Sequence, residues 1–299
     1  MELPRAAVLA AIDASRAALG TPTDAAWLCP LPTAHVGGLL VLLRAIAGGG
    51  DVEVLPRLHV DAVARSDARW TSLVPTMLRR LVEAGAALGR FDGILVGGAG
   101  LDPDLRAAAE ALGARIVETY GCTESCGGIV YDGRAIPGTG VAVRADGRIL
   151  LRGPTLLRRY RGDDAATASA FDTDGALVTR DVGRFDADGR LEVLGRADDA
   201  IATGGETVHP LPVERALARH PGVADVAVAG VPDPEWGERV VAFVVPRDAD
   251  APPVLADLRS LARETLPPWA EPRDLVLLAE LPRTPSGKVL RRALREQTR

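Results

Sequence analysis

The chain has 299 residues, enough for one large domain or for a large and a small one. Hydrophobic residues make up 47% and charged residues 25%, which is ordinary for a globular protein, and a net charge of −5 argues against nucleic acid and anionic membranes as partners. The apolar runs are too short to span a bilayer, no signal-peptide pattern opens the chain, and three cysteines form no even disulfide framework, so we expect a cytoplasmic protein without a membrane span.

Helical and strand patterns alternate over the first 120 residues. The apolar periodicity, with proline at three of the four helix starts, predicts helices at 4–19, 36–47, 75–84 and 103–112. Short apolar runs predict strands at 27–30, 52–55, 70–74, 93–98 and 115–120. This alternation predicts an α/β fold with a parallel sheet, whose sites lie at the carboxyl ends of its strands.

The pattern changes twice after that. Four short strands at 141–144, 148–152, 176–179 and 191–194 are separated by Asp-Gly turns, which predicts a β-rich subdomain. The remainder reads as a hairpin at 200–208, helices at 211–218 and 254–266, and strands at 226–231, 240–245 and 275–278. We therefore expect three parts: 1–140, the α/β part of a core; 141–196, its β-rich subdomain; and 197–299, a small α+β domain.

Lys288 is the only lysine, so 34 of the 35 basic side chains are arginine. A surface charge tolerates either cation, whereas a site that needs a compact ammonium does not tolerate arginine. One surviving lysine could also be chance. It lies, however, in the turn-rich segment Pro282-Arg283-Thr284-Pro285-Ser286-Gly287-Lys288, which favours a catalytic role.

Two loops follow expected strands of the parallel sheet. Gly97-Gly98-Ala99-Gly100 would let a flat ligand approach the backbone, or it is only a tight strand-to-helix turn. Tyr120-Gly121-Cys122-Thr123-Glu124 offers an aromatic face, a hydroxyl and a carboxylate, which suit a ring, a phosphate and a divalent cation. A capped turn is the alternative for this second loop.

Further polar residues are weaker candidates. Thr179-Arg180-Asp181 closes an expected strand, and a buried Asp181 with Arg196 could hold a ribose and a phosphate, although a surface ion pair is the commoner fate. His35, at a helix entrance, is expected to be a pocket-wall or structural residue, with a direct catalytic role as the less favoured alternative. Gly48-Gly49-Gly50 lacks the lysine and hydroxyl of a phosphate loop and is expected to be a plain connection, and the Cys122/Cys126 pair is a poor zinc site.

Taken in order, these motifs resemble the adenylate-forming superfamily of acyl-CoA synthetases, luciferases and peptide-synthetase adenylation domains. The resemblance rests on Tyr120-Gly-x-Thr-Glu, Asp181, Gly195-Arg196-x-Asp-Asp, Gly204-Gly205 and Pro-x-Gly-Lys288, and it covers essentially the whole chain. It implies an AMP-forming acid–CoA ligase that uses ATP, Mg²⁺ and coenzyme A. It also implies nucleotide-binding residues, namely Gly97, Gly98, Ala99, Tyr120, Gly121, Thr123, Asp181 and Arg196.

The resemblance also assigns the remaining roles. Glu124 would bind Mg²⁺, and Lys288 would bridge the acid and the α-phosphate from a mobile C-terminal domain that turns about Asp198. Gly204 and Gly205 would then admit the pantetheine thiol of coenzyme A. The segments around His35, Ser72-Thr76 and Leu95-Val-Gly-Gly-Ala look most like actinobacterial o-succinylbenzoate–CoA ligases of menaquinone synthesis, which makes His35, Ser72 and Thr76 candidates for contact with the acid. Another aryl or acyl acid is the alternative substrate.

Two departures from the family pattern stand out. The usual Thr-Gly-Asp is Thr179-Arg180-Asp181, and the Ser/Thr/Gly-rich phosphate loop is absent from the sequence given. One hypothesis is that Met1 is a valine codon read as a start, with the true protein extending upstream. The other is a shortened protein that binds nucleotide or coenzyme A, alone or with another chain, without efficient use of ATP. We expect a small-molecule acid and coenzyme A as partners, with a homodimer as one option.

Overall fold

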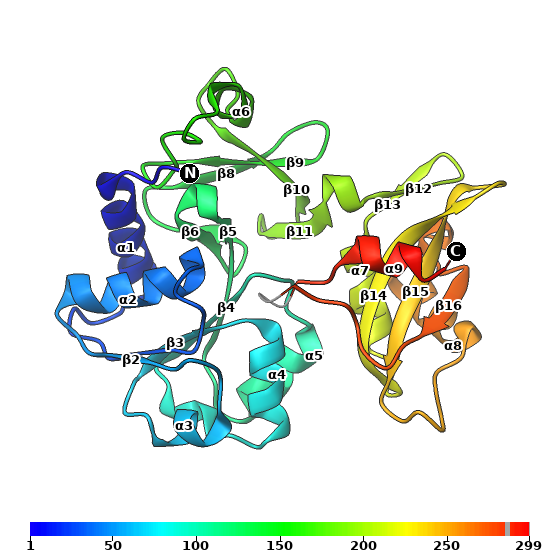
Figure 1. Cartoon of the computed structure of the whole chain (residues 1–299), viewed down its shortest axis with the longest axis horizontal. Coiled ribbons are helices and arrows are strands. Elements are labelled where there is room, and N and C mark those ends of the chain that lie inside the picture. The colour runs from blue at the N-terminus through cyan, green and yellow to red at the C-terminus, as the bar shows by residue number, and fades with distance from the viewer. Residues whose placement is uncertain (285–287, 299) are drawn as a thin grey trace. The chain divides into compact units, whose positions relative to one another are not determined.

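The structure is a computed structural model that describes residues 1–284 and 288–298. The chain forms two compact units. The first consists of Met1–Thr179 and Gly183–Glu192, and the second of Arg180–Val182 and Val193–Arg299. The expected α/β class, with a large part built on a sheet containing parallel strands and a smaller C-terminal part, is confirmed (Figure 1).

The first unit is built on a seven-stranded sheet in the order β2-β1-β3-β4-β5-β6-β7. The strands are β1 (Trp27–Cys29), β2 (Val52–Val54), β3 (Trp70–Leu73), β4 (Gly93–Gly97), β5 (Ile116–Cys122), β6 (Gly127–Tyr131) and β7 (Arg134–Ala135). The first five are parallel, whereas β6 and β7 are antiparallel additions that the sequence reading did not predict. Asp132 and Gly133 both adopt positive φ, as the two-residue hairpin between β6 and β7 requires.

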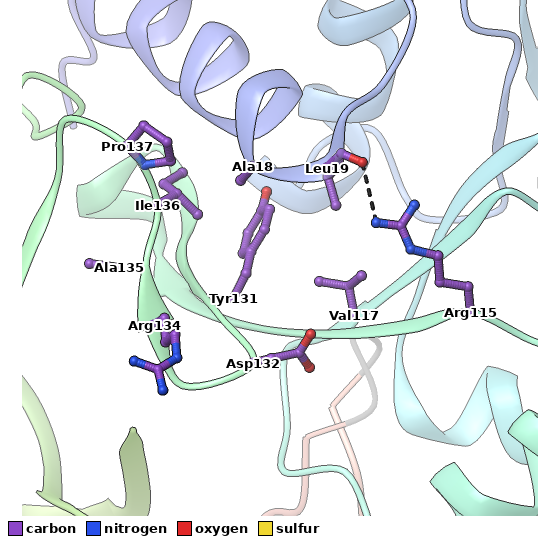
Figure 2. A pocket seen from close by; sticks show the side chains of 10 residues that line it. All are labelled: Ala18, Leu19, Arg115, Val117, Tyr131, Asp132, Arg134, Ala135, Ile136 and Pro137. Atoms are coloured by element: carbon purple, nitrogen blue, oxygen red, sulfur yellow. Dashed lines mark hydrogen bonds between the residues drawn. The ribbon is translucent and has the colours of Figure 1, made fainter. Parts of the chain in front are cut away.

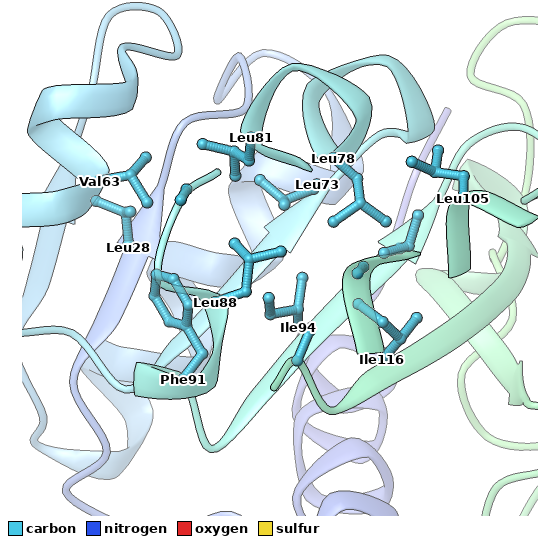
Figure 3. Close-up of a cluster of buried hydrophobic side chains, with 14 of the residues drawn as sticks. Leu28, Val63, Leu73, Leu78, Leu81, Leu88, Phe91, Ile94, Leu105 and Ile116 are labelled. Carbon is cyan, nitrogen blue, oxygen red and sulfur yellow. The ribbon is translucent and has the colours of Figure 1, made fainter. Parts of the chain in front are cut away.

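Helices cover both faces of this sheet (Figure 1). They are α1 (Arg5–Leu19), α2 (Val36–Gly48), α3 (Val60–Arg65), α4 (Pro75–Glu83) and α5 (Pro103–Ala111), with a 3₁₀ turn at Leu88–Arg90. One face packs Leu78 and Leu81 of α4, with apolar residues of α3 and α5, onto β1, β3, β4 and β5 in a continuous core (Figure 3). On the other side, α1 and α2 contribute Ala11 and Leu40 to a cluster with Cys126.

Two local expectations can be compared with these elements. Gly49, in the left-handed conformation, ends α2, so Gly48-Gly49-Gly50 is the plain connection that was expected. The six-residue α3 was not predicted, because it is shorter than two turns and only Val63 is buried.

A four-stranded sheet follows in the order β11-β10-β9-β8. Its strands are β8 (Gly140–Val143), β9 (Arg148–Arg152), β10 (Leu177–Phe185) and β11 (Leu191–Arg196). Between β9 and β10 lies an unpredicted helix, α6 (Asp164–Ala170), whose first turn is capped by the Asp163 carboxylate, 2.8 Å from the amide of Ala166. Strand β10 runs much further than the 176–179 expected from the sequence.

The second unit has a five-stranded sheet in the order β13-β12-β15-β14, with β16 parallel to β15. Its strands are β12 (Ile201–Thr203), β13 (Glu206–Val208), β14 (Val223–Asp233), β15 (Gly237–Pro246) and β16 (Asp274–Leu277). Its helices are α7 (Pro210–Ala218), α8 (Leu255–Thr265) and α9 (Arg291–Glu296), with a 3₁₀ turn at Pro268–Ala270.

Side chains of β14 and β15 alternate between two hydrophobic clusters. Val228 and Val244 pack with α7 and α8, whereas Ala229 and Phe243 pack with Leu281 and α9. The C-terminal segment that carries Lys288 is therefore part of the core of this unit. Among the described residues, no helix is long and apolar enough to cross a membrane.

Candidate active site

The polar motifs of the first unit meet at one edge of its sheet. Strands β3, β4 and β5 are adjacent and parallel, with Leu73 paired to Val96 and Gly97 paired to Thr119, so their carboxyl ends lie side by side. The loop from Gly97 to Ala99 follows β4, the motif from Tyr120 to Glu124 closes β5, and Thr76 lies in the first turn of α4 after β3. The structure thus brings these predicted site residues together at the edge where open α/β sheets bind ligands.

The glycines of these loops are required by their surroundings. A Cβ on Gly97 would lie 2.4 Å from Oγ1 of Thr119, and Gly98 has a φ of +83°. A Cβ on Gly121 would lie 2.0 Å from the carbonyl oxygen of Gly127. A Cβ would therefore collide with the Thr119 side chain at Gly97 and with the backbone at Gly121, while the positive φ of Gly98 disfavours any other residue. Gly98 and Gly121 are both exposed, which leaves their backbone open to a ligand.

The acid-site candidates differ in exposure. Ser72 is buried in β3, where it is 7% exposed, and Thr76 is half-buried. His35 is the N-cap residue of α2 and is exposed. A bound acid would therefore contact Ser72 only if it reached below the edge of the sheet. Thr76 and His35 are more accessible to a ligand at that edge.

Glu124 has a fixed carboxylate. It belongs to the 3₁₀ turn Thr123–Ser125, and its Oε1 accepts a hydrogen bond of 2.9 Å from the Tyr160 hydroxyl. Its carbonyl oxygen accepts from the amide of Leu157 at 2.7 Å. The sequence reading missed Tyr160, since nothing in the local pattern links it to a residue 36 positions earlier.

Burial disfavours the thiolate form of the two cysteines beside this motif. Burial raises the pKa of Cys122 to about 12, against the opposing effect of a hydrogen bond to Ser125, and burial raises the pKa of Cys126 to about 11. The Ser125 hydroxyl accepts from the amide of Cys122 and donates to the carbonyl of Gly127, at 3.0 and 2.8 Å. These groups hold the turn that places Thr123 at the surface and Glu124 beside Tyr160.

Tyr120 connects the sheet edge to the β-rich subdomain. Its hydroxyl donates to Oγ1 of Thr179 at 3.5 Å, and Thr179 donates to the carbonyl of Ile149 at 2.9 Å. The expectation that Asp181 closes a strand and is buried was wrong. Asp181 lies in the middle of β10 and is half-buried, because pairing with the neighbouring strands carries β10 on to Phe185.

In the second unit, Arg196 and Asp198 form a two-point ion pair. Nε of Arg196 lies 3.1 Å from Oδ1 of Asp198, and Nη2 lies 3.2 Å from Oδ2. The guanidinium hydrogen bond holds the pKa of the Asp198 carboxyl below its usual value. Asp198 belongs to the 3₁₀ turn Ala197–Asp199 that leads into β12.

The Gly204-Gly205 pair forms the turn between β12 and β13, and both residues have positive φ. The amide of Gly204 donates to the carbonyl of Trp236 at 2.9 Å, and the Trp236 ring packs where a Cβ of Gly204 would be. The Arg273 guanidinium stacks 3.7 Å from the centre of that ring. Trp236 therefore belongs with the candidate loop, although it was not predicted from the sequence. The sequence feature that could have indicated it is the segment Val231-Pro-Asp-Pro-Glu-Trp-Gly-Glu.

Lys288 is exposed, while its backbone is held. Its amide donates to Oγ1 of Thr284 at 3.1 Å, and its carbonyl accepts from the amide of Thr284 at 2.8 Å. Within residues 1–284 and 288–298, no carboxylate pairs with its ammonium. Pro285, Ser286 and Gly287, which complete the predicted motif, lie outside the described residues.

Arg44 is a buried cation that the sequence reading did not single out. It lies in α2, is 6% exposed, and its Nε and Nη2 donate to Ser15 and Tyr131 at 3.1 and 3.4 Å. Its guanidinium also lies 5.5 Å from the centre of the Trp27 ring. Across the described part of the chain, it has no carboxylate partner. The Tyr131 ring stands beside the end of α1 at a pocket of about 240 Å³ (Figure 2).

Comparison with known proteins identifies the family. Residues 4–161 match the AMP-binding enzyme family, and residues 212–288 match the AMP-binding enzyme C-terminal domain. The chain belongs to the AMP-binding enzyme family. Over 98% of its length it is 41% identical to a protein of Mycobacterium tuberculosis named probable 2-succinylbenzoate–CoA ligase, of which it covers 79%.

Solved structures give the same family. The chain is similar to o-succinylbenzoate CoA synthetase of Bacillus subtilis in complex with the acyl-adenylate, with a TM-score of 0.88, 29% identity, and coverage of 98% of this chain and 65% of that one. An amide bond synthetase of Marinactinospora thermotolerans matches with a TM-score of 0.91 and 30% identity, over 99% of this chain and 66% of that one. Membership of this family supports binding of ATP or AMP by the chain.

Proposed function

We propose that this chain is the adenylating and lid portion of an AMP-forming acid–CoA ligase whose acid is 2-succinylbenzoate. The observation that carries the proposal is the 41% identity, over nearly the whole chain, to the protein named for that activity in Mycobacterium tuberculosis. The similarity to a synthetase solved with its acyl-adenylate supports the same reaction. Cytoplasmic location, the homodimer and the lack of a nucleic-acid partner stay predictions of the sequence.

The first unit would hold the adenine ring, the α-phosphate and Mg²⁺. We assign adenine to the space between the Gly97-Gly98-Ala99 loop and Tyr120, where glycine leaves the backbone open. Gly121 and the exposed Thr123 hydroxyl would bond the α-phosphate. Glu124 fits a Mg²⁺ ligand, since Mg²⁺ is held by one or two carboxylates together with phosphate oxygens, and Tyr160 fixes its orientation. Mg²⁺ would supply positive charge to the phosphates.

Asp181 and Arg196 would bind the ribose and a phosphate. Asp181 lies close enough to raise the pKa of Arg196 by charge attraction, after the larger effect of the Asp198 hydrogen bond. Nε and Nη2 of Arg196 both contact Asp198. We propose that this pair opens or shares its donors when the nucleotide binds, which would couple nucleotide binding to the backbone at Asp198.

Lys288 would act on the first of two reactions. A carboxylate oxygen of the acid attacks the α-phosphorus of ATP, the new O–P bond forms, and the bond to pyrophosphate breaks. Negative charge gathers on the α-phosphate oxygens, which an ammonium without a carboxylate partner can stabilise. In the second reaction, the thiol of coenzyme A attacks the acyl carbon and loses its proton to solvent. A C–S bond forms, the C–O bond to the phosphate breaks, and AMP leaves. We assign Gly204 and Gly205 to the passage of that thiol.

His35, Ser72 and Thr76 remain our candidates for contact with the acid. Arg44 is not among them, because it lies about two and a half turns, or about 13 Å, beyond His35 along α2. Its guanidinium lies beside the Trp27 ring at the amino end of β1, whereas the candidate site is at the carboxyl ends of the strands. Its donors go to Ser15 and Tyr131, so we assign Arg44 to support of the fold.

A pyrophosphate-exchange screen over carboxylic acids tests the proposal, run on this chain and on a version extended upstream in the genomic frame. We expect exchange with 2-succinylbenzoate, and formation of AMP and an acyl-CoA when coenzyme A is added. Exchange with a different aryl acid alone would replace the substrate. Binding of AMP and coenzyme A in calorimetry, without exchange by either version, would instead identify a non-adenylating binding protein.

A further inference from the structure

Arg291 is a largely buried cation at the start of α9 in the second unit. Its Nη1 lies 3.1 Å from Oδ2 of Asp199, its Nη2 lies 2.7 Å from Oε1 of Glu214, and its Nε donates to the carbonyl of Val228 at 3.2 Å. The arginine side chain is 20% exposed and that of Glu214 is 13% exposed. These contacts are therefore shielded from water, which makes the ion pairs stronger and less mobile than surface pairs.

The three partners come from separate parts of the unit. Asp199 directly follows Asp198 in the turn Ala197–Asp199, Glu214 lies in α7, and Val228 lies in β14. The Glu214 carboxylate also accepts from the amide of Val228 at 2.9 Å. One guanidinium thus joins the turn that follows β11 to the body of the unit.

Arg291 also lies three residues after Lys288, and the segment before it is held equally firmly. The amide of Leu290 donates to the carbonyl of Pro282 at 2.8 Å, and Arg283 pairs with Asp225 of β14 at 2.7 Å. Leu281 and Leu294 belong to one hydrophobic cluster. The backbone at Lys288 is consequently fastened on both sides, by Arg283 before it and by Arg291 after it.

We propose that Arg291 is a positioning residue for Lys288, and that its pair with Asp199 fixes where the hinge at Asp198 ends. This inference rests on the proposed function and on the hinge role of Asp198. Backbone rotation beyond Asp198 would pull Asp199 away from Arg291, so rotation is confined to Asp198 and the residues before it. Lys288 and the end of the hinge then move as one body, which keeps the ammonium accurately placed for the first reaction.

The pair can be tested by the separate half-reactions. Asp199→Asn keeps the shape of the side chain and removes its charge. We expect pyrophosphate exchange to fall at least tenfold, and thioester formation from preformed acyl-adenylate and coenzyme A to change less than threefold. Asp199→Glu, which keeps the carboxylate, should retain exchange within about threefold. Glu264→Gln is the matched control, because it removes a carboxylate that pairs with Arg219 at 3.0 Å on the surface of the same unit.

A double mutant distinguishes a positioning role from support of the fold. The Lys288→Met variant has no ammonium to position, so adding Asp199→Asn to it should not lower the residual pyrophosphate exchange further. A similar loss in both half-reactions, or the same additional loss in the Lys288→Met background, would overturn the inference while the ligase assignment stands. A wild-type protein without exchange, as given and in extended form, would refute the proposed function and this inference together.

Discussion

Replacing Lys288 by methionine removes the only lysine ammonium of the chain and keeps a side chain of similar length. Because the side chain is exposed and has no carboxylate partner in the described ranges, the free energy of unfolding should change by less than about 0.5 kcal/mol. The backbone bonds to Thr284 do not depend on the side chain and should persist. A loss of activity in Lys288→Met would therefore not be explained by a loss of stability.

Adenylation should nevertheless fall by about 100- to 1,000-fold, which is the usual cost of removing one donor that stabilises charge in a transition state. Pyrophosphate exchange measures this step, and thioester formation from preformed acyl-adenylate measures the second step, which should stay within about threefold. Lys288→Arg should lose adenylation as well, since a planar guanidinium does not replace a compact ammonium at one point of contact.

Arg292→Met supplies the control for loss of positive charge. Arg292 is 93% exposed, belongs to the same terminal segment, and pairs within α9 with Glu296 at 3.4 Å. It should adenylate like the wild type. Equal exchange rates in wild type and Lys288→Met, or equal losses in Lys288→Met and Arg292→Met, would refute the assignment of Lys288.

Three other predictions concern the rest of the fold. Gly121→Ala should destabilise the protein by about 1–3 kcal/mol and weaken AMP binding. Gly140→Ala is the control, because a Cβ there would lie 3.6 Å from Cβ of Arg152, which is an ordinary contact, and it should behave like wild type in thermal unfolding and calorimetry. The pKa of Glu271 is lowered chiefly by its hydrogen bond to Arg263. The free energy of unfolding lost in Glu271→Gln should therefore be constant above about pH 5 and shrink as the pH falls through the native pKa of that carboxyl. A loss of stability that grows in acid would contradict this. Because burial raises the pKa of Cys122 to about 12, an aromatic disulfide reagent at pH 8 should label that thiol only after unfolding, and prompt labelling of the native protein would show that the turn opens.

The parallel strands and their helices were predictable because their signals are local. Pro75 and Pro103 open helices in the structure as in the sequence, and Gly49 ends one. What the sequence reading missed depends on long-range pairing. Strand β6 is defined by its pairing with β5, and the length of β10 by the strands beside it, which is why Asp181 was placed at a strand end. The Asp132-Gly133 turn was visible in the sequence and would have predicted the hairpin that ends the sheet.

The distinction between local signals and long-range pairing also applies to the candidate site. The carboxyl ends of neighbouring parallel strands meet by topology, so the loops at Gly97 and Tyr120 could be placed together from sequence alone. Tyr160, Arg44 and Arg291 could not, because each acquires its role from partners that are remote in the chain. A buried arginine and a surface arginine look identical in a sequence where almost every cation is arginine.

The solitary lysine also makes the chain suited to site-specific labelling. Its ε-amine is the only side-chain amine in the sequence, so once the N-terminal α-amine is blocked, an amine-directed fluorophore at alkaline pH reports on one defined point of the C-terminal unit without any engineered cysteine. Bound adenylate should protect that amine if Lys288 lies against the acyl phosphate, and a lysine-specific protease, for which the chain offers a single cleavage position, should be blocked at the same time. Chemical footprinting can therefore follow the position of Lys288 in a protein with its natural sequence.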